Sequence, residues 1–165
     1  MTIDIRRIRD RLPQEIADLE SEARREGYRH VARLIDEWST GAVRFDRDGE
    51  RLLGAYADDA LVGIGGITVD PAMSGALRMR RFYIRPAMRG RGIGRMLALA
   101  LLDHARSRCG IVTVHAGNDR AARFWESLGF QPHGREGNTH LLELQHNSDD
   151  PAASDLRRCV TPRSP

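Results

Sequence analysis

This sequence of 165 residues contains no lysine: all 26 of its basic side chains are arginine. Aromatic residues make up only 5%, and Asp and Glu are interleaved with the arginines. The chain therefore offers neither a basic block nor a stacking platform for nucleic acid. We expect no nucleic-acid partner, although the pI of about 9.4 keeps an accessory nucleic-acid-binding role as an alternative. We interpret the arginine-only basic set as the mark of a GC-rich bacterial genome.

Long apolar runs are absent too. No stretch approaches the roughly 20 apolar residues of a membrane helix, and the start lacks a cationic segment followed by an apolar one, so we expect a cytoplasmic protein without membrane contact. Cysteine is scarce, and the contexts of Cys109 and Cys159 predict neither a disulfide, nor a catalytic thiol, nor a metal site. Length and composition predict one domain over residues 1–146 and a disordered tail over residues 147–165.

Hydrophobic periodicity predicts antiparallel strands first and alternating strands and helices second, which is a mixed α/β fold. The expected strands are residues 2–8, 52–56, 61–69, 77–84, 111–115 and 141–144. The expected helices are residues 13–27, a second helix that ends at Gly41, a third that begins near Gly92 or Ile93, and a fourth after Asn118.

A glycine-rich turn, RGRGIG over residues 89–94, follows the apolar run at residues 82–84. Apolar residues then recur at positions 93, 96, 97, 100 and 101, which indicates one face of a helix. The first amides of a helix have no intrahelical partner, and they lie at the positive end of its dipole. The turn over residues 89–94 is therefore a predicted phosphate-binding site, called the phosphate seat below. Arg89 and Arg91 add two cations beside it.

Spacing distinguishes this turn from two other glycine-rich loops. A Walker loop has Lys and then Ser or Thr after its last glycine, but Arg95 and Met96 stand there, which excludes that loop. A dinucleotide fingerprint has its third glycine where Arg95 stands, so that interpretation is weak. The pattern that remains is Arg/Gln-x-x-Gly-x-Gly/Ala.

A second motif follows the strand at residues 111–115. Asn118 occupies an N-cap position, and Gly129 and Phe130 end the helix that it begins. One face of this helix carries Ala121, Phe124, Trp125 and Leu128.

The two motifs, in this order and about thirty residues apart, resemble the acetyl-CoA-binding signatures of the GCN5-related N-acetyltransferases, the GNAT family. The resemblance implies a mixed sheet with antiparallel N-terminal strands, a splayed parallel pair and helices on both faces. It implies acetyl-CoA as cosubstrate, with main-chain groups of Phe82 and Ile84 at the pantetheine arm and the thioester oxygen, and with Asn118 at the same arm. The coenzyme-binding residues expected from it are Phe82, Tyr83, Ile84, Arg89, Gly90, Arg91, Gly92, Ile93, Gly94, Asn118 and Trp125.

Catalytic groups are less clearly indicated. Trp125 stands where many family members have a tyrosine beside the leaving sulfur, and an indole N–H is no general acid at neutral pH, so a packing role is the alternative. The candidate general base is Glu50, which follows a turn, with a solvated turn carboxylate as the alternative interpretation. Asp70 and His115 also stand at strand ends.

The sequence thus predicts an N-acetyltransferase that acts on a primary amine of a small molecule or peptide. A CoA-binding sensor, or a family member without turnover, is the alternative that Trp125 supports. A homodimer is compatible with the sequence, which names no acceptor.

Overall fold

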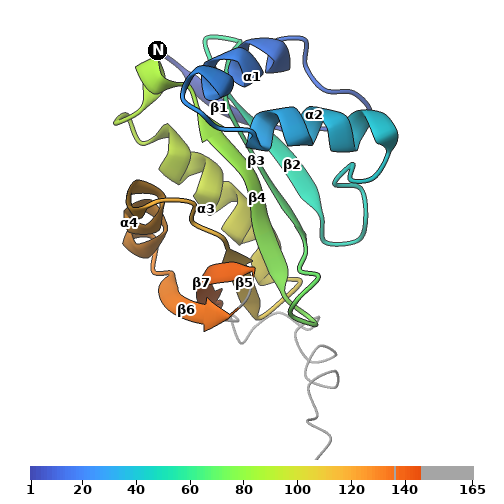
Figure 1. The fold of residues 1–165 in the computed structure, drawn as a ribbon, viewed down its shortest axis with the longest axis vertical. Helices are drawn as coiled ribbons and strands as arrows, with labels where there is room; N and C mark the ends of the chain where they lie inside the picture. Colours follow the sequence, from blue (N-terminus) through green and yellow to red (C-terminus); the bar gives the residue numbers. More distant parts are fainter. Residues whose placement is uncertain (136, 146–165) are drawn as a thin grey trace, which may run out of the picture. The chain divides into compact units, whose positions relative to one another are not determined.

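The computed structural model describes residues 1–135 and 137–145. The predicted tail at residues 147–165 lies outside them. Four α-helices, one 3-10 helix and seven strands form in the described part (Figure 1). In chain order they are β1 (Ile3–Ile8), α1 (Ile16–Arg25), α2 (His30–Thr40), β2 (Arg51–Ala57), β3 (Ala60–Val69), β4 (Leu77–Ile84), η1 (Pro86–Met88), α3 (Ile93–Arg106), β5 (Ile111–Val114), α4 (Asp119–Ser127), β6 (Gln131–Arg135) and β7 (Asn138–Glu143).

The strands follow the order β1-β2-β3-β4-β5-β7-β6, and the chain has the mixed α/β fold expected from the sequence. Antiparallel pairing joins β1 with β2, β2 with β3, β5 with β7, and β6 with β7. The one parallel pair is β4 with β5, and in the described chain its register covers Leu77 with Val112 and Arg78 with Thr113.

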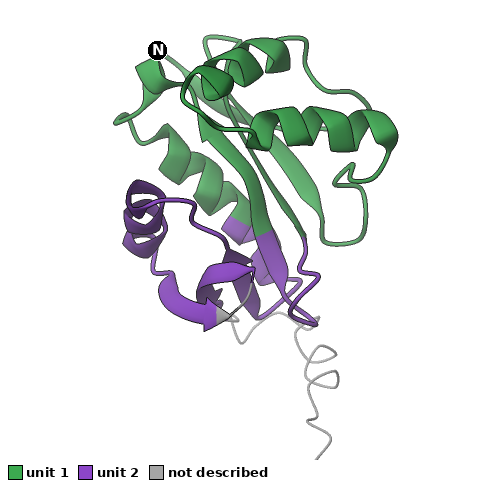
Figure 2. Ribbon diagram, viewed as in Figure 1, with its two compact units in different colours: residues 1–68, 79–101 green, residues 69–78, 102–165 purple. Residues whose placement is uncertain are grey.

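Two compact units can be distinguished: residues 1–68 with 79–101, and residues 69–78 with the described part of 102–165 (Figure 2). The expectation of a single domain over residues 1–146 stays a prediction. In the first unit, α1 and α2 cover one face of the strands, because their buried residues pack with Leu61, Ile64 and Tyr83 (Figure 1). Val62 follows Leu61 in β3, and adjacent strand residues point to opposite faces. Ile93 of α3 packs with Val62, so α3 begins on the other face of these strands.

The second unit contains β5, β6, β7 and α4. A buried carboxylate lies among its strands: Asp70 accepts hydrogen bonds from the Thr113 hydroxyl and, at 2.9 Å, from the Asn138 amide. The backbone amide of Ala72 donates to the same side chain at 2.8 Å. Burial on its own would raise the pKa of Asp70, but these hydrogen bonds outweigh it and lower the pKa below its ordinary value.

Three sequence expectations differ from the structure in detail. Helix α1 begins at Ile16 rather than near Pro13, because Pro13 lies in a turn closed by a hydrogen bond from Ile16 to its carbonyl. Met96, expected on the buried face of α3, is 42% exposed, and the buried stripe runs instead through Leu97, Ala98, Leu101, Leu102 and Ala105. Strand β6 was not expected, since Gln131–Arg135 holds a proline and a glycine and has no apolar alternation.

Candidate functional site

The predicted phosphate seat is the connection from β4 to α3. Gly90 and Gly92 adopt the left-handed backbone conformation, with φ of 75° and 79°, which only glycine adopts at little cost. A Cβ atom at either position would meet nothing within 4 Å. The amide of Met96 donates to the Gly92 carbonyl at 3.0 Å, so Gly92 caps α3, and the amides before Met96 have no intrahelical acceptor. Backbone donors at the positive end of a helix dipole, with open space over the glycines, suit a phosphate group.

The side chain of Arg89 turns toward Glu26, the C-cap residue of α1. Its guanidinium donates to both carboxylate oxygens of Glu26 at 2.6 and 2.8 Å, and to the Ile84 carbonyl at 2.9 Å. It also lies 5.3 Å from the centre of the Tyr83 ring. Arg91 is exposed. Of the two arginines of the motif, Arg91 is therefore the one whose charge faces solvent.

Tyr83 is 3% exposed and serves packing and hydrogen bonding. Its hydroxyl donates to Glu26 at 2.7 Å. Burial, followed by this hydrogen bond and the charge of Glu26, raises the pKa of Tyr83 far above its ordinary value, so the phenol stays protonated. Its neighbours Phe82 and Ile84 are partly buried, and their carbonyl oxygens accept from His30 and Arg89, respectively.

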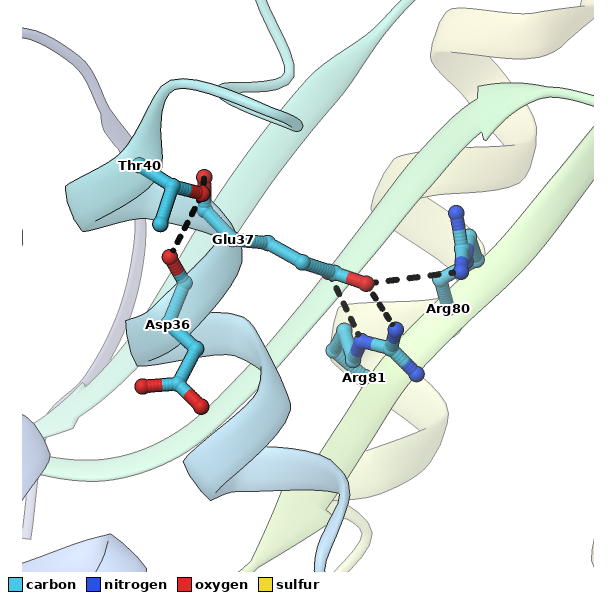
Figure 3. Close-up of polar contacts among 5 residues, drawn as sticks. All are labelled: Asp36, Glu37, Thr40, Arg80 and Arg81. Atoms are coloured by element: carbon cyan, nitrogen blue, oxygen red, sulfur yellow. Dashed lines mark hydrogen bonds and ion pairs between the residues drawn. The ribbon is translucent and has the colours of Figure 1, made fainter.

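Strand β4 carries an irregular backbone just before these residues. Arg81 has φ of 58°, an uncommon conformation for a residue with a side chain and one that costs about 1–2 kcal/mol. Its guanidinium is held by Glu37 of α2, at 2.5 and 3.2 Å, and Arg80 lies 3.8 Å from the same carboxylate (Figure 3). An ion pair from α2 thus fixes β4 where its conformation is strained.

The second motif lies in the second unit. Asn118 caps α4: its Oδ1 accepts from the amide of Ala121 at 2.9 Å, as expected from the sequence. Trp125 is 4% exposed and packs edge to face against Phe124 and Phe130 at centroid distances of 4.9 and 5.3 Å. These contacts favour its packing role.

The three carboxylate and imidazole candidates for the general base have different environments. Glu50 is 7% exposed and accepts from the Arg47 amide, so it is a buried side chain rather than a solvated turn carboxylate. Asp70 is 3% exposed and is held by several donors. His115 is exposed at the end of β5. Glu50 stays a prediction, and the lowered pKa of Asp70 makes this carboxylate a poor proton acceptor.

Two residues that the sequence reasoning missed stand beside the predicted coenzyme-binding segment. Glu26 holds Arg89 and Tyr83, and His30 donates to Phe82 over a separation of 52 residues. Neither has a local sequence signal, because their partners are distant in the chain.

Comparison with known proteins agrees with this geometry. The sequence matches the acetyltransferase (GNAT) family over residues 13–130. The chain is a member of the GNAT family of acetyltransferases. It is 30% identical over 128 residues to the N-alpha-acetyltransferase RimI of Mycobacterium tuberculosis, a match that covers 71% of this chain and 80% of RimI.

Solved structures show the same fold. An acetyltransferase structure from Exiguobacterium sp. 255-15 superimposes with a TM-score of 0.79 at 25% identity, covering 87% of this chain and 94% of that one. The PaiA N-acetyltransferase of Thermoplasma acidophilum, solved in complex with coenzyme A, matches with a TM-score of 0.61 at 21% identity, over 88% of this chain and all of that one. None of the helices in the described chain has the length and apolar character needed to cross a membrane.

Proposed function

We propose that this protein transfers the acetyl group of acetyl-CoA to a primary amine, and that the acceptor is the α-amino group of a peptide. The observation that carries the proposal is the pair of open, left-handed glycines before the first turn of α3. The name of the mycobacterial relative, an N-alpha-acetyltransferase, supports the α-amine. A small-molecule amine is the other acceptor class that the family supports.

The residues present fit the coenzyme. Gly90, Gly92 and the first amides of α3 would hold its diphosphate, and main-chain groups of Phe82 and Ile84 would hold its pantetheine arm. The bound coenzyme supplies an activated acetyl carbonyl. The chain contributes orientation, and a main-chain donor at the carbonyl oxygen lowers the barrier by roughly 3 kcal/mol in comparable sites.

Ligand binding and glycine substitution test the seat together. Saturation with acetyl-CoA at a hundred times its Kd should raise the free energy of unfolding by about 2.7 kcal/mol. Gly92→Ala should abolish this rise, because its methyl group fills the seat and a left-handed alanine disturbs the loop. Gly75→Ala is the matched control: Gly75 also has φ of 79° and open space at its Cβ, but it lies in the β3–β4 loop. Both variants should lose about 1 kcal/mol of stability from backbone strain, and only Gly92→Ala should lose the ligand response.

Turnover is tested separately by thiol release. Peptides with a free α-amine, the same peptides with that amine blocked, and small amines should be compared as acceptors. Release only with free amines supports the transferase. A protein that acetyl-CoA stabilises but that releases no thiol with any acceptor would be the CoA-binding sensor. Retained binding in Gly92→Ala would refute the proposed seat.

A further inference from the structure

His30, the first residue of α2, has an environment suited to proton transfer. Its Nε2 lies 2.9 Å from the carbonyl oxygen of Phe82. Its ring packs edge to face between Tyr28 and Tyr83, at centroid distances of 5.6 and 5.7 Å. The imidazole is therefore fixed in orientation against the main chain that we propose holds the acetyl-CoA arm.

The hydrogen bond settles which ring nitrogen carries the proton. A carbonyl oxygen only accepts, so Nε2 of His30 is protonated, and in the neutral ring Nδ1 keeps a lone pair. Among residues 1–135 and 137–145, His30 has no hydrogen bond to Nδ1. This nitrogen is not fully buried, so solvent reaches it. The ring thus presents a basic nitrogen to a molecule that approaches from solvent.

The charges around the ring keep it neutral. Burial lowers the pKa of His30 below its ordinary 6.5, and the guanidinium groups of Arg81 and Arg33 lower it further. The Phe82 carbonyl and the carboxylate of Glu26 act in the opposite direction and do not outweigh these effects. At pH 7 the imidazole is consequently in its basic form.

On the basis of the function proposed above, we propose that His30 is a catalytic residue: its Nδ1 takes the proton from the acceptor ammonium group. The amine nitrogen then forms its bond to the acetyl carbon, the carbon–sulfur bond breaks, and the sulfur leaves with the electron pair. The second amine proton neutralises the thiolate, directly or through water, and the imidazolium returns its proton to solvent.

The proton affinities of the amines themselves favour an α-amine as the acceptor, whichever base takes the proton. An α-ammonium group has a pKa near 7.7–8.0 and a lysine ammonium one near 10.4, so the transfer to a weakly basic imidazole is less uphill for the α-amine by a factor of at least about 100. A carboxylate is a weaker base than an imidazole, so proton transfer to it would be more uphill for either amine. The substrate class implied is a peptide or small molecule with an α-amino group.

The test uses His30→Gln, whose side-chain amide can still donate to the Phe82 carbonyl but which has no basic nitrogen. With an α-amine peptide, kcat should fall by about 100-fold or more, while the acetyl-CoA-induced stabilisation stays as in the wild type. With an acceptor amine that is already neutral at pH 7, the loss should shrink to less than about tenfold, since no proton has to be removed first. His104→Gln, at a partly buried histidine of α3, is the control and should leave both rates unchanged.

Histidine NMR gives a readout independent of turnover. The ring signals that disappear in His30→Gln should titrate below pH 6.5 in the wild type and show the Nε2–H tautomer in the neutral form. Equal losses with both acceptors, or a kcat within about threefold of the wild type, would overturn the assignment, as would an Nδ1–H tautomer. If the variant does not fold, the acidic limb of the wild-type kcat/KM profile with the neutral acceptor amine decides, because it reports the free enzyme and must match the pKa below 6.5 of one of the wild-type histidine signals. A wild-type protein that acetylates no amine would refute the proposed function, whereas active wild type with equally active His30→Gln refutes only the role of His30.

Discussion

At the scale of single residues, Asp70 shows how this chain tolerates a buried charge. It is 3% exposed, and neutral donors, Thr113, Asn138 and the backbone at Ala72, satisfy its carboxylate. Such a group is stabilising only while it is ionised, because all of these neighbours donate and the protonated acid would add a further donor.

Asp70→Asn should therefore lower the free energy of unfolding at pH 7 by about 2 kcal/mol, since the amide cannot accept from all these donors. Folding lowers the pKa of Asp70, so the unfolded chain binds the proton more readily, and the stabilisation present at neutral pH is lost as the pH falls below about 4. The difference between variant and wild type should shrink over that range. Urea unfolding at pH 7, 5, 4 and 3 measures it, with the exposed Asp103→Asn as control. A difference that does not change with pH would show that the carboxylate is not ionised in the native state.

The same scale shows what a sequence can and cannot predict about a site. The glycine-rich turn before α3 and the N-cap at Asn118 were predictable because turns and caps depend on residues a few positions apart. His30 and Glu26 were not, since their partners lie 52 to 63 residues away and only the fold brings them together. The alternative interpretation of Glu50, a solvated turn carboxylate, was wrong because Glu50 is buried, and the position of a turn relative to the core is also a tertiary property.

At the scale of elements, ion pairs tie α2 and the C-terminal end of α1 to β4 and to the segment that follows it. Glu37 of α2 holds Arg81 at the strained position of β4 (Figure 3). Glu37→Ala should cost about 1–3 kcal/mol, because the guanidinium, whose side chain is only 11% exposed, loses its bidentate acceptor. Asp36→Ala, one residue earlier on the same helix, should be nearly neutral, since its side chain is exposed. Chemical denaturation of both variants measures the contrast, and equal costs would mean that helix propensity, not the ion pair, decides.

The contact between α1 and Arg89 allows a double-mutant cycle. Glu26→Gln and Arg89→Gln should show a coupling energy of roughly 1 kcal/mol, limited by partial exposure of both side chains. The same cycle on Glu20 and Arg24 should give no more than about 0.5 kcal/mol, because that pair is 3.8 Å apart and Arg24 is 71% exposed. Urea unfolding of the wild type and the six variants supplies the free energies. If the coupling between Glu26 and Arg89 is no larger than that between Glu20 and Arg24, Glu26 does not hold the start of the predicted phosphate seat.

Element boundaries were predictable wherever the sequence alternates or breaks clearly. Residues 77–84 were expected as a strand and form β4, and Gly41, with φ of 77°, ends α2 as expected. Strand β6 was not predicted, because pairing with its antiparallel partner β7 stabilises it and it has no apolar pattern of its own. The exposure of Met96 is likewise set by what covers α3, which helical periodicity alone does not define.

At the scale of the whole molecule, the question is whether the two compact units unfold together. Strand β4 and helix α3 each contribute residues to both units. The chain also has one tryptophan in each unit: Trp38 in the first and Trp125 in the second, and both are buried. Each tryptophan can therefore report on its own unit.

Because continuous elements belong to both units, unfolding of one unit should break the strand β4 and the helix α3 that it shares with the other. We therefore expect a single transition. In Trp125→Phe, fluorescence reports Trp38, and in Trp38→Phe it reports Trp125. In each variant the fluorescence midpoint in urea should agree with that of far-UV circular dichroism to within about 0.2 M. Acetyl-CoA should then shift both probes equally, since a ligand of the native state stabilises everything that unfolds with its site. Separate midpoints, or a shift confined to Trp38, would show that the units are independently stable and that only the one with the glycine-rich turn is linked to the ligand.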